Sequence, residues 1–494
     1  MKMVENLRFG ESSSEKIHLE TKDEAEKIIA ALIQEVVDRN RQSQTPSKEL
    51  LKNLVTVVDG EVGIGKSYTL KKYVRENPGC RTLIFLERKR AVQGYADELG
   101  GLAIYSDNNK PPIEAQLGEA LTGAERIVIM THSALLDLLK DNRHLYVFEC
   151  FDLVAIDETF TSLSIYDDDY DDYSEIIGSL SLCGAQHAED VSKIIRSVID
   201  KVLLSGKDQV EILSFTEKDR SVARSVIQEL TESSGHILSN SKIESLIKFL
   251  NNVAHEHGKV FYIEKIGNKT HLLSACSFFP KNRSLIFFAD GGSKEGSILA
   301  MKKYSPGVEV KSVMLRHVNW NTHTFHIERG ASGKGAINNL GRRNMTRLVS
   351  SLSEIESSLI LSHKDLADEL RQEISLDRHD ILHWANHKGT NQYSHHRRMY
   401  ILSLYWQPPK VYSSKYLSEV DRGSYKPGEY ESINLPVLNL TTEVKQAVGR
   451  INRNYEHDQV DIYLRIPDGE LGDTLIEQLQ REFSGATFVS ETWY

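Results

Sequence analysis

The sequence contains few cysteines, and none are paired at metal-binding spacing. Its four cysteines, Cys80, Cys150, Cys183 and Cys276, are far apart, and no C-x-x-C pair occurs. This pattern signals neither a cysteine-based zinc site nor an iron-sulfur cluster. We expect the thiols to be reduced and mostly buried, as is usual in cytosolic proteins.

Long apolar runs and an excess of positive charge are also missing. No segment approaches the roughly 18 consecutive apolar residues that a membrane span needs, and the first ten residues, MKMVENLRFG, lack the apolar core of a signal peptide. We therefore expect a soluble, intracellular (cytoplasmic) protein with no membrane partner. The 60 Lys and Arg against 70 Asp and Glu give a net charge of −10, which argues against a surface that binds polyanions everywhere and allows one local basic groove.

The length and composition are those of a folded protein with several domains. At roughly 150 residues per domain, the 494 residues correspond to about three domains. Hydrophobic residues make up 40% and charged residues 26%, which excludes collagen-like, coiled-coil and wholly disordered classes.

Short apolar runs alternate with longer amphipathic segments in two series. The first series lies at 54–58, 81–86, 126–130 and 151–156, and a run at 284–289 is expected to return to it. The second series lies at 357–362, 380–384, 399–406 and 460–466. Such alternation is typical of parallel sheets that are covered by helices on both faces, so we expect an α/β fold with two such sheets.

The remaining segments suggest the domain organisation. Residues 1–45 contain apolar residues at helical spacing and predict a helical accessory segment, and 161–276 predicts a mainly helical insertion with a hairpin that turns at Gly267 and Asn268. The run YDDDYDDY at 166–173 is expected to be a solvated loop. The expected units are 1–45, a first α/β domain at 46–160 completed by 277–300, the insertion at 161–276, and a second α/β domain at 301–494.

A phosphate-binding loop follows the first predicted strand. The segment GEVGIGKS at 60–67 matches G-x-x-x-x-G-K-[ST] and precedes a helical pattern, which is the context this motif requires. Its glycines let backbone N–H groups face an anion, Lys66 can reach the β and γ phosphates, and Ser67 can bind Mg²⁺. A chance turn is the alternative. The expected nucleotide-binding residues are Gly60, Glu61, Val62, Gly63, Ile64, Gly65, Lys66, Ser67 and Tyr68.

Two carboxylates end a later apolar run, FDLVAIDET. Asp157 and Glu158 are therefore expected at the carboxyl end of a buried strand, where α/β proteins bind ligands. In that place Asp157 would hold Mg²⁺, and Glu158 would orient and deprotonate the attacking water. By itself the pair is also compatible with a helix cap at Asp157.

Two arginines lie three residues apart near the C-terminus, in QAVGRINR. If the segment is helical, Arg450 and Arg453 share one face, and their guanidinium groups suit the charge that develops on a γ phosphate. The alternative is a pair of solvated arginines in surface ion pairs.

The order and spacing of these motifs resemble those of superfamily 2 helicases and translocases. GEVGIGKS resembles motif I, IDET motif II and QAVGRINR motif VI, and the resemblance covers about residues 50–160 and 280–470. It implies two RecA-like P-loop domains that bind Mg-ATP between them. It also adds Gln446 to the catalytic residues, and Gly389 of a motif V-like segment to the nucleotide-binding residues.

The resemblance further implies that one nucleic-acid strand lies across both domains, held mostly through phosphates. DNA is favoured over RNA as the partner, and the insertion is a possible docking site for a protein. The candidate nucleic-acid contacts are Arg88, Lys89, Thr131, His132, His363, Lys364, Lys388, Thr390 and Asn391.

The function expected from the sequence is that of an ATP-dependent helicase or translocase. Two alternatives stay open: a terminase-like packaging ATPase with a C-terminal nuclease, and a binding factor that uses ATP as a switch without unwinding.

Overall fold

The computed structural model places two helix-flanked parallel sheets and a third, antiparallel sheet. It describes residues 14–19, 21–43, 53–61, 63–122, 125–140, 146–157, 166–169, 189–196, 210–213, 215–232, 246–247, 250, 253–254, 259–266, 269–276, 283–289, 298, 308–316, 320–334, 347, 351–352, 357–374, 378–384, 393–407, 411–412, 424–425, 434–451 and 458–492.

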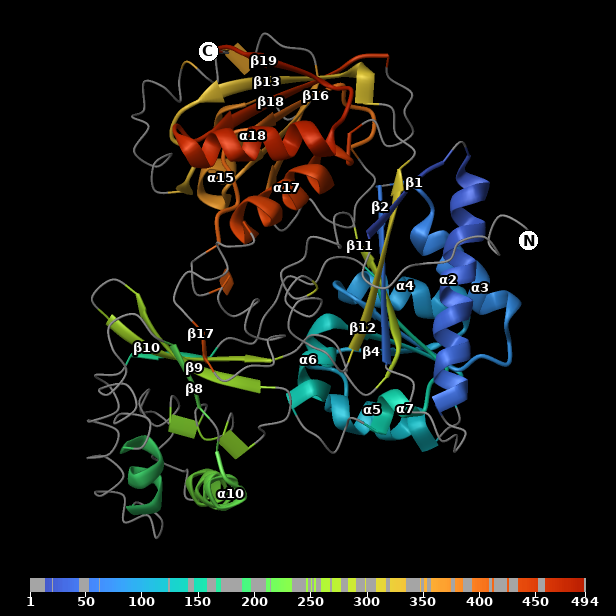
Figure 1. Ribbon diagram of the computed structural model, residues 1–494, viewed down its shortest axis with the longest axis vertical. Helices are drawn as coiled ribbons and strands as arrows, with labels where there is room; N and C mark the ends of the chain where they lie inside the picture. The colour runs from blue at the N-terminus through green and yellow to red at the C-terminus, as the bar shows by residue number, and fades with distance from the viewer. Residues whose placement is uncertain are drawn as a thin grey trace.

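The first domain is built on a parallel sheet. Its elements are β1 (Ser14–His18), α2 (Lys22–Ser43), β2 (Asn53–Gly60), α3 (Lys66–Glu76), β3 (Thr82–Leu86), α4 (Lys89–Leu99), β4 (Leu102–Ile104), α5 (Ile113–Thr122), β5 (Ile127–Thr131), α6 (His132–Lys140), α7 (Tyr146–Glu149), β6 (Leu153–Asp157), β11 (Leu285–Ala289) and β12 (Val308–Arg316). Within the described residues the sheet has eight strands in the order β1-β12-β2-β11-β6-β3-β5-β4, and all neighbours are parallel (Figure 1).

The apolar runs form the central strands because both faces of the sheet are covered. Strands β3, β5, β6 and β11 are buried along their whole length. One face packs against α2, α3 and α4, and the other against α5, α6 and α7. Without alternation of polar residues, such strands are stable only when water is excluded from both faces. The first predicted strand series, including the return of 284–289, is confirmed.

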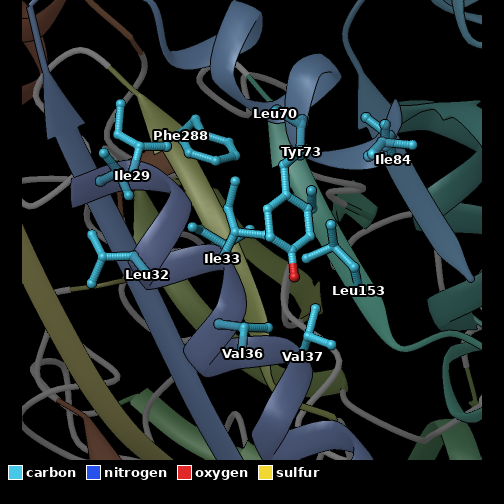
Figure 2. Packing of buried hydrophobic residues seen from close by; sticks show 14 of the residues in the cluster. Ile29, Leu32, Ile33, Val36, Val37, Leu70, Tyr73, Ile84, Leu153 and Phe288 are labelled. Atoms are coloured by element: carbon cyan, nitrogen blue, oxygen red, sulfur yellow. The ribbon is translucent and has the colours of Figure 1, made fainter. Parts of the chain in front are cut away.

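Helix α2 belongs to the core of the first domain. Figure 2 shows Ile29, Ile33 and Val37 of this helix beside Tyr73 of α3 and Phe288 of β11. Asn40, which is 1% exposed, donates from Nδ2 to the carbonyls of Asp152 and Ser284, both at 2.9 Å.

The expected boundaries at 45 and 301 are therefore wrong. Strand β1 lies at one edge of the first sheet, and β12 lies between β1 and β2. Leu315 of β12 is in register with Gly60 of β2. Residues 14–43 and 308–316 are thus parts of the first domain, since their apolar side chains complete its core.

The insertion contains a sheet as well as helices. Its elements are β7 (Tyr166–Asp169), β8 (Val210–Leu213), α10 (Glu217–Glu232), β9 (Lys259–Ile266) and β10 (Lys269–Cys276), and β17 (Ser424–Tyr425) joins them from the later chain. Among the described residues these strands form a five-stranded sheet in the order β17-β8-β9-β10-β7. The hairpin β9–β10 is confirmed. The described helices at 189–196 and in α10 agree with the expected helical content of the insertion, and the sheet adds to it. The expected solvated loop is wrong at 166–169, because β7 pairs with β10, and residues 170–173 lie outside the described residues.

The second domain also has a parallel sheet. Its elements are η3 (Trp320–Thr322), β13 (His323–Arg329), β14 (Ser358–Ser362), α15 (Lys364–Glu373), β15 (His379–His383), β16 (Arg398–Ile401), α17 (Leu435–Val448), β18 (Val460–Ile466), α18 (Glu470–Glu482) and β19 (Thr487–Ser490). In the described part of this domain six strands follow the order β15-β14-β16-β18-β13-β19, all parallel. The predicted second strand series and the α/β fold with two parallel sheets are confirmed.

Among the helices within the described ranges, none combines the length and the apolar character that crossing a membrane would need.

Candidate nucleotide and nucleic-acid site

The phosphate loop joins β2 to α3 in the conformation that its glycines make possible. Gly63 and Gly65 have φ angles of 85° and 94°, which other residues adopt only with strain. Lys66 is the first residue of α3, and Thr69 Oγ1 donates to the Gly65 carbonyl at 2.9 Å. The helix therefore begins directly behind the loop, and its free N–H groups and dipole favour an anion there.

Lys66 lies over the loop that precedes it. Its Nζ donates to the carbonyls of Gly60 and Glu61, at 2.5 and 3.1 Å. A Cβ atom at Gly60 would come within 3.0 Å of Ile64 Cγ2 and 3.2 Å of Lys66 Cδ. A side chain at this position would therefore push Ile64 and Lys66 aside by a few tenths of an ångström. The loop thus has the tight backbone cradle, the ammonium group and the helix N-terminus that fit a nucleotide phosphate.

Asp157 ends strand β6 at the same edge of the sheet as the phosphate loop. It is in register with Phe288 of β11, which is in register with Val58 of β2, so one strand separates the carboxylate from the loop strand. At about 4.8 Å per strand, the two strands lie roughly 10 Å apart. Asp157 and the loop that carries Lys66 and Ser67 therefore lie at one edge of the sheet, two strands apart.

Tyr95 of α4 holds the Asp157 carboxylate. Its hydroxyl donates to Asp157 Oδ2 at 2.7 Å, and Asp157 is 3% exposed. Lys71 of α3 lies 5.0 Å from the centre of the Tyr95 ring. No motif in the sequence points to Tyr95, because no spacing rule connects it with a residue 62 positions away.

The other loop residues differ in accessibility. Ser67 is half-buried and Tyr68 is 58% exposed, whereas Glu61 and Ile64 are buried at 2% and 3%. Ile64 packs into the apolar core beneath the loop. Val62, Glu158, Gly389 and Arg453 lie outside the described residues.

Helix α17 carries the candidate residues of the second domain. Gln446 is 5% exposed, and Arg450, which follows the helix, is 8% exposed. Helix α17 ends at Val448, and Arg450 lies in a turn. The condition for Arg450 and Arg453 to share one helix face is therefore not met at Arg450. Helix α17 is buried from Asn439 onward, polar residues included, which is unusual for a helix that only covers a sheet.

A buried network of charges connects the two domains at this helix. Asp59, the residue before Gly60, faces Arg316 at the end of β12, with Nη1 3.6 Å from Oδ1. The other arm, Nη2, lies 3.6 Å from Glu482 Oε2 of α18. Glu482 Oε2 in turn accepts a hydrogen bond from Lys445 Nζ of α17 at 3.3 Å. The phosphate-loop strand and the residue before Gln446 thus belong to one chain of ion pairs.

These four side chains are shielded from water. Asp59 is 0% and Lys445 2% exposed, and the side chains of Arg316 and Glu482 are 8% and 10% exposed. Charges so shielded interact more strongly than surface pairs. The network therefore holds the carboxyl edge of the first sheet against α17 and α18.

The candidate nucleic-acid contacts differ in exposure. Arg88 and Lys89 follow β3, and Lys89 Nζ lies 3.6 Å from Asp107 Oδ2. Lys364 is exposed and His363 is half-buried after β14, where burial lowers the pKa of the histidine. Thr131 and His132 differ from the expectation of surface contacts: each is 3% exposed, and Thr131 Oγ1 accepts the Ala134 N–H as a helix cap. Lys388, Thr390 and Asn391 lie outside the described residues.

The comparisons with known proteins give structural matches only. No family model matches the sequence, and no curated protein matches it. Solved structures similar to this one include S. tokodaii Xpd4, at 11% identity and a TM-score of 0.47 over 94% of this chain and 100% of that chain. An XPD structure in the apo form gives 10% identity and a TM-score of 0.49, over 93% of this chain and 100% of that one.

A further similar structure is S. cerevisiae Dbp5 bound to RNA and ADP BeF3, at 10% identity and a TM-score of 0.37, with 96% of each chain covered. All three matches have a TM-score below 0.5 and an identity of 10–11%, so they do not show a function. Function is therefore inferred from the side chains of this protein.

Proposed function

We propose that the protein is an ATP-dependent helicase or translocase that moves along nucleic acid, with DNA as the favoured track. One observation carries the proposal. The buried Asp59–Arg316–Glu482–Lys445 network sets α17 against the sheet edge that holds the phosphate loop and Asp157. A nucleotide bound at that edge would contact both domains, which is what conversion of hydrolysis into movement requires.

The first domain binds and orients ATP in this proposal. Lys66 and the N-terminus of α3 bind the phosphates, and the glycines admit them close to the backbone. Ser67 and Asp157 would hold Mg²⁺, which supplies positive charge to the phosphate oxygens when bound. Tyr95 keeps the Asp157 carboxylate facing the site. Glu158 follows directly in the sequence and would take the proton of the attacking water.

The second domain completes the site. Lys445 and Gln446 are neighbours on α17, so the network that holds Lys445 also holds the helical turn from which Gln446 projects. Arg450 lies two residues beyond the helix end, and with Arg453 it would neutralise the charge that develops on the γ phosphate. Release of that charge after hydrolysis would weaken the contact between domains, and each cycle would shift the strand bound across them.

Basic residues after two strand ends, of which Lys89 and Lys364 are exposed and Arg88 is half-buried, support a site for phosphates of the nucleic acid. Arg88, Lys89 and Lys364 follow the carboxyl ends of β3 and β14, the side of a parallel sheet where ligands bind. Phosphate contacts give affinity without sequence preference. The five-stranded sheet of the insertion would select the form of nucleic acid or dock a partner protein.

Steady-state ATP hydrolysis tests the proposal. Purified protein would be assayed alone and with single-stranded DNA, duplex DNA, forked DNA and RNA, with Lys66→Ala as the inactive control. We expect stimulation by at least one polymer, DNA first, that weakens as salt rises. Hydrolysis indifferent to every polymer would contradict a nucleic-acid motor, and tight ATP binding without turnover would favour a switch.

A further inference from the structure

Two histidines and an aspartate converge at the amino-terminal edge of the second sheet, away from the carboxyl edge. Asp380 is the second residue of β15. His395 and His396 lie three and two residues before the start of β16. One possible ligand atom from each lies within 4.8 Å of the others. His396 Nε2 is 2.7 Å and His395 Nε2 3.8 Å from Asp380 Oδ2.

The orientation of His396 is fixed from behind. Its Nδ1 lies 2.6 Å from the hydroxyl of Ser357, and the side chain is only 2% exposed. With Nδ1 engaged by Ser357, Nε2 faces the cluster. Histidines that bind metals commonly have the second ring nitrogen held in this way, which sets the tautomer and the ring orientation.

The charges around the cluster leave it able to accept a cation. Of the nearby arginines, Arg371 pairs with Asp368 at 2.5 Å, and Arg398 lies 3.8 Å from Asp461. The Asp380 carboxylate lies within 4 Å of both imidazoles and supplies negative charge to the cluster.

We propose that Asp380, His395 and His396 form a binding site for a divalent transition-metal ion of the Zn²⁺ class. Imidazole nitrogens and a carboxylate suit Zn²⁺, Ni²⁺ or Co²⁺, whereas Mg²⁺ prefers oxygen ligands alone. Bonds of about 2.0–2.2 Å require neighbouring ligand atoms about 3.3 Å apart, and the observed 2.7 and 3.8 Å lie on either side of that value. Exposure of His395 and Asp380, at 59% and 43%, leaves remaining coordination positions to water.

The ion would fasten one segment of chain to two strands. His395 and His396 lie in the turn that leads into β16, where the His396 N–H donates to the Tyr393 carbonyl at 3.2 Å. Asp380 lies on β15. Ser357, which contacts His396, directly precedes β14. Residues 388–391, with the candidate nucleic-acid contacts, come shortly before this turn in the sequence. The site is separate from the proposed ATP site and does not depend on the proposed function.

Isothermal titration of the full chain with ZnCl₂ tests the site. The protein would carry no polyhistidine tag and would first be stripped with a chelator that is then removed. We expect one ion per chain at this site, and affinity at least tenfold weaker in His395→Ala and in Asp380→Asn. His395 is exposed, so its replacement should leave the melting temperature of the chelator-treated protein unchanged.

His383→Ala is the matched control. His383 lies on the same strand, β15, and its Nδ1 is 2.7 Å from the Trp384 carbonyl, outside the cluster, so Zn²⁺ affinity should stay as in the wild type. Saturable binding that survives millimolar Mg²⁺ supports the site. An absence of saturable binding, or equal affinity of wild type and His395→Ala, would overturn it.

Discussion

Arg316 and Glu482 form an ion pair between the two α/β domains, with Nη2 and Oε2 3.6 Å apart. The other arm of the same guanidinium faces Asp59 and also donates to the Asp59 carbonyl at 3.2 Å. One side chain therefore touches the strand that leads into the phosphate loop and the helix that packs beside α17. This places Arg316 where it can transmit the state of one domain to the other.

Two replacements of Arg316 should have different effects: Arg316→Ala should lower the stability of the protein, and Arg316→Lys should lower its kcat. Arg316→Ala leaves Asp59 buried without this partner, and breaking a buried pair costs about 3 kcal/mol or more, so the melting temperature should fall. Arg316→Lys keeps the charge, but lysine has no two-armed fork to serve both carboxylates. We expect it to fold with nearly normal ATP affinity and a clearly lower kcat in the presence of nucleic acid.

Arg39→Ala is the matched control for Arg316. Arg39 pairs with Glu309 of the same strand β12 at 2.9 Å, but Glu309 is 45% exposed. Exposed pairs contribute about 1 kcal/mol or less, so stability and turnover should stay close to wild type. Equal kcat in Arg316→Lys and the wild type would mean that Arg316 plays no part beyond folding.

Tyr95→Phe should impair hydrolysis without unfolding the protein. The substitution removes the hydroxyl that donates to Asp157 Oδ2 at 2.7 Å and keeps the ring. A hydrogen bond to a charged group contributes about 1.5–3 kcal/mol, and a less well-held Asp157 should raise the Mg²⁺ concentration needed for half-maximal hydrolysis. Tyr105→Phe is the control, since its hydroxyl donates to Gln93 at 3.3 Å. Identical Mg²⁺ dependence in both variants would exclude this role for Tyr95.

Gly60→Ala should weaken ATP binding. The added Cβ would meet Ile64 Cγ2 at 3.0 Å and Lys66 Cδ at 3.2 Å, so Lys66 would have to move, and we expect at least tenfold weaker binding of a fluorescent ATP analogue. Gly94→Ala is the control, because no atom lies within 4 Å of its added Cβ. Within helix α4 this change should stabilise the protein by about 1 kcal/mol. Normal ATP affinity of Gly60→Ala would contradict the phosphate cradle.

His323 should make the second domain less stable in acid. Burial lowers its pKa to about 4, from an ordinary value of 6.5. The unfolded chain therefore binds a proton between pH 6.5 and 4 that the folded protein does not, and the free energy of unfolding falls by about 3 kcal/mol over that window. Above pH 6.5 the effect is absent.

Melting temperatures of wild type and His323→Phe between pH 7 and 4 check this effect. Phenylalanine can keep the edge contact with Trp320, whose ring centre is 4.7 Å from that of His323, and it does not titrate. The melting temperature of the variant should fall less in acid than that of the wild type. Parallel pH profiles would show that His323 is not the group responsible.

The sequence predicted the strands that are buried on both faces, because their uninterrupted apolar runs have few other solutions. It did not predict the places of β1 and β12. Strand β1, SEKIH, is short and charged, and β12, VEVKSVMLR, alternates polar and apolar residues. Neither pattern says which sheet the strand joins, since that depends on packing with residues far along the chain.

The phosphate loop could be predicted because its residues are contiguous. Asp59, Arg316, Lys445 and Glu482 could not, because each is an ordinary charged residue in sequence and only burial and pairing single them out. Tyr95 could not be predicted either. Its partner Asp157 was predicted from its place at a strand end, but the Tyr95 hydroxyl that donates to it comes from a separate helix, α4. Local motifs thus indicate the nucleotide side of the proposed site, and tertiary packing supplies the contact between domains.

The most direct test of an ATP site shared by two domains is single-turnover ATP hydrolysis by Arg450→Ala in the presence of the stimulating polymer. ATP affinity, measured separately with a fluorescent analogue, should stay near that of the wild type, because the first domain supplies the phosphate cradle. The hydrolysis rate should fall by about 10³-fold, as expected when an arginine that faces the γ phosphate is removed. Wild-type hydrolysis by a folded Arg450→Ala protein would contradict a site completed by the second domain.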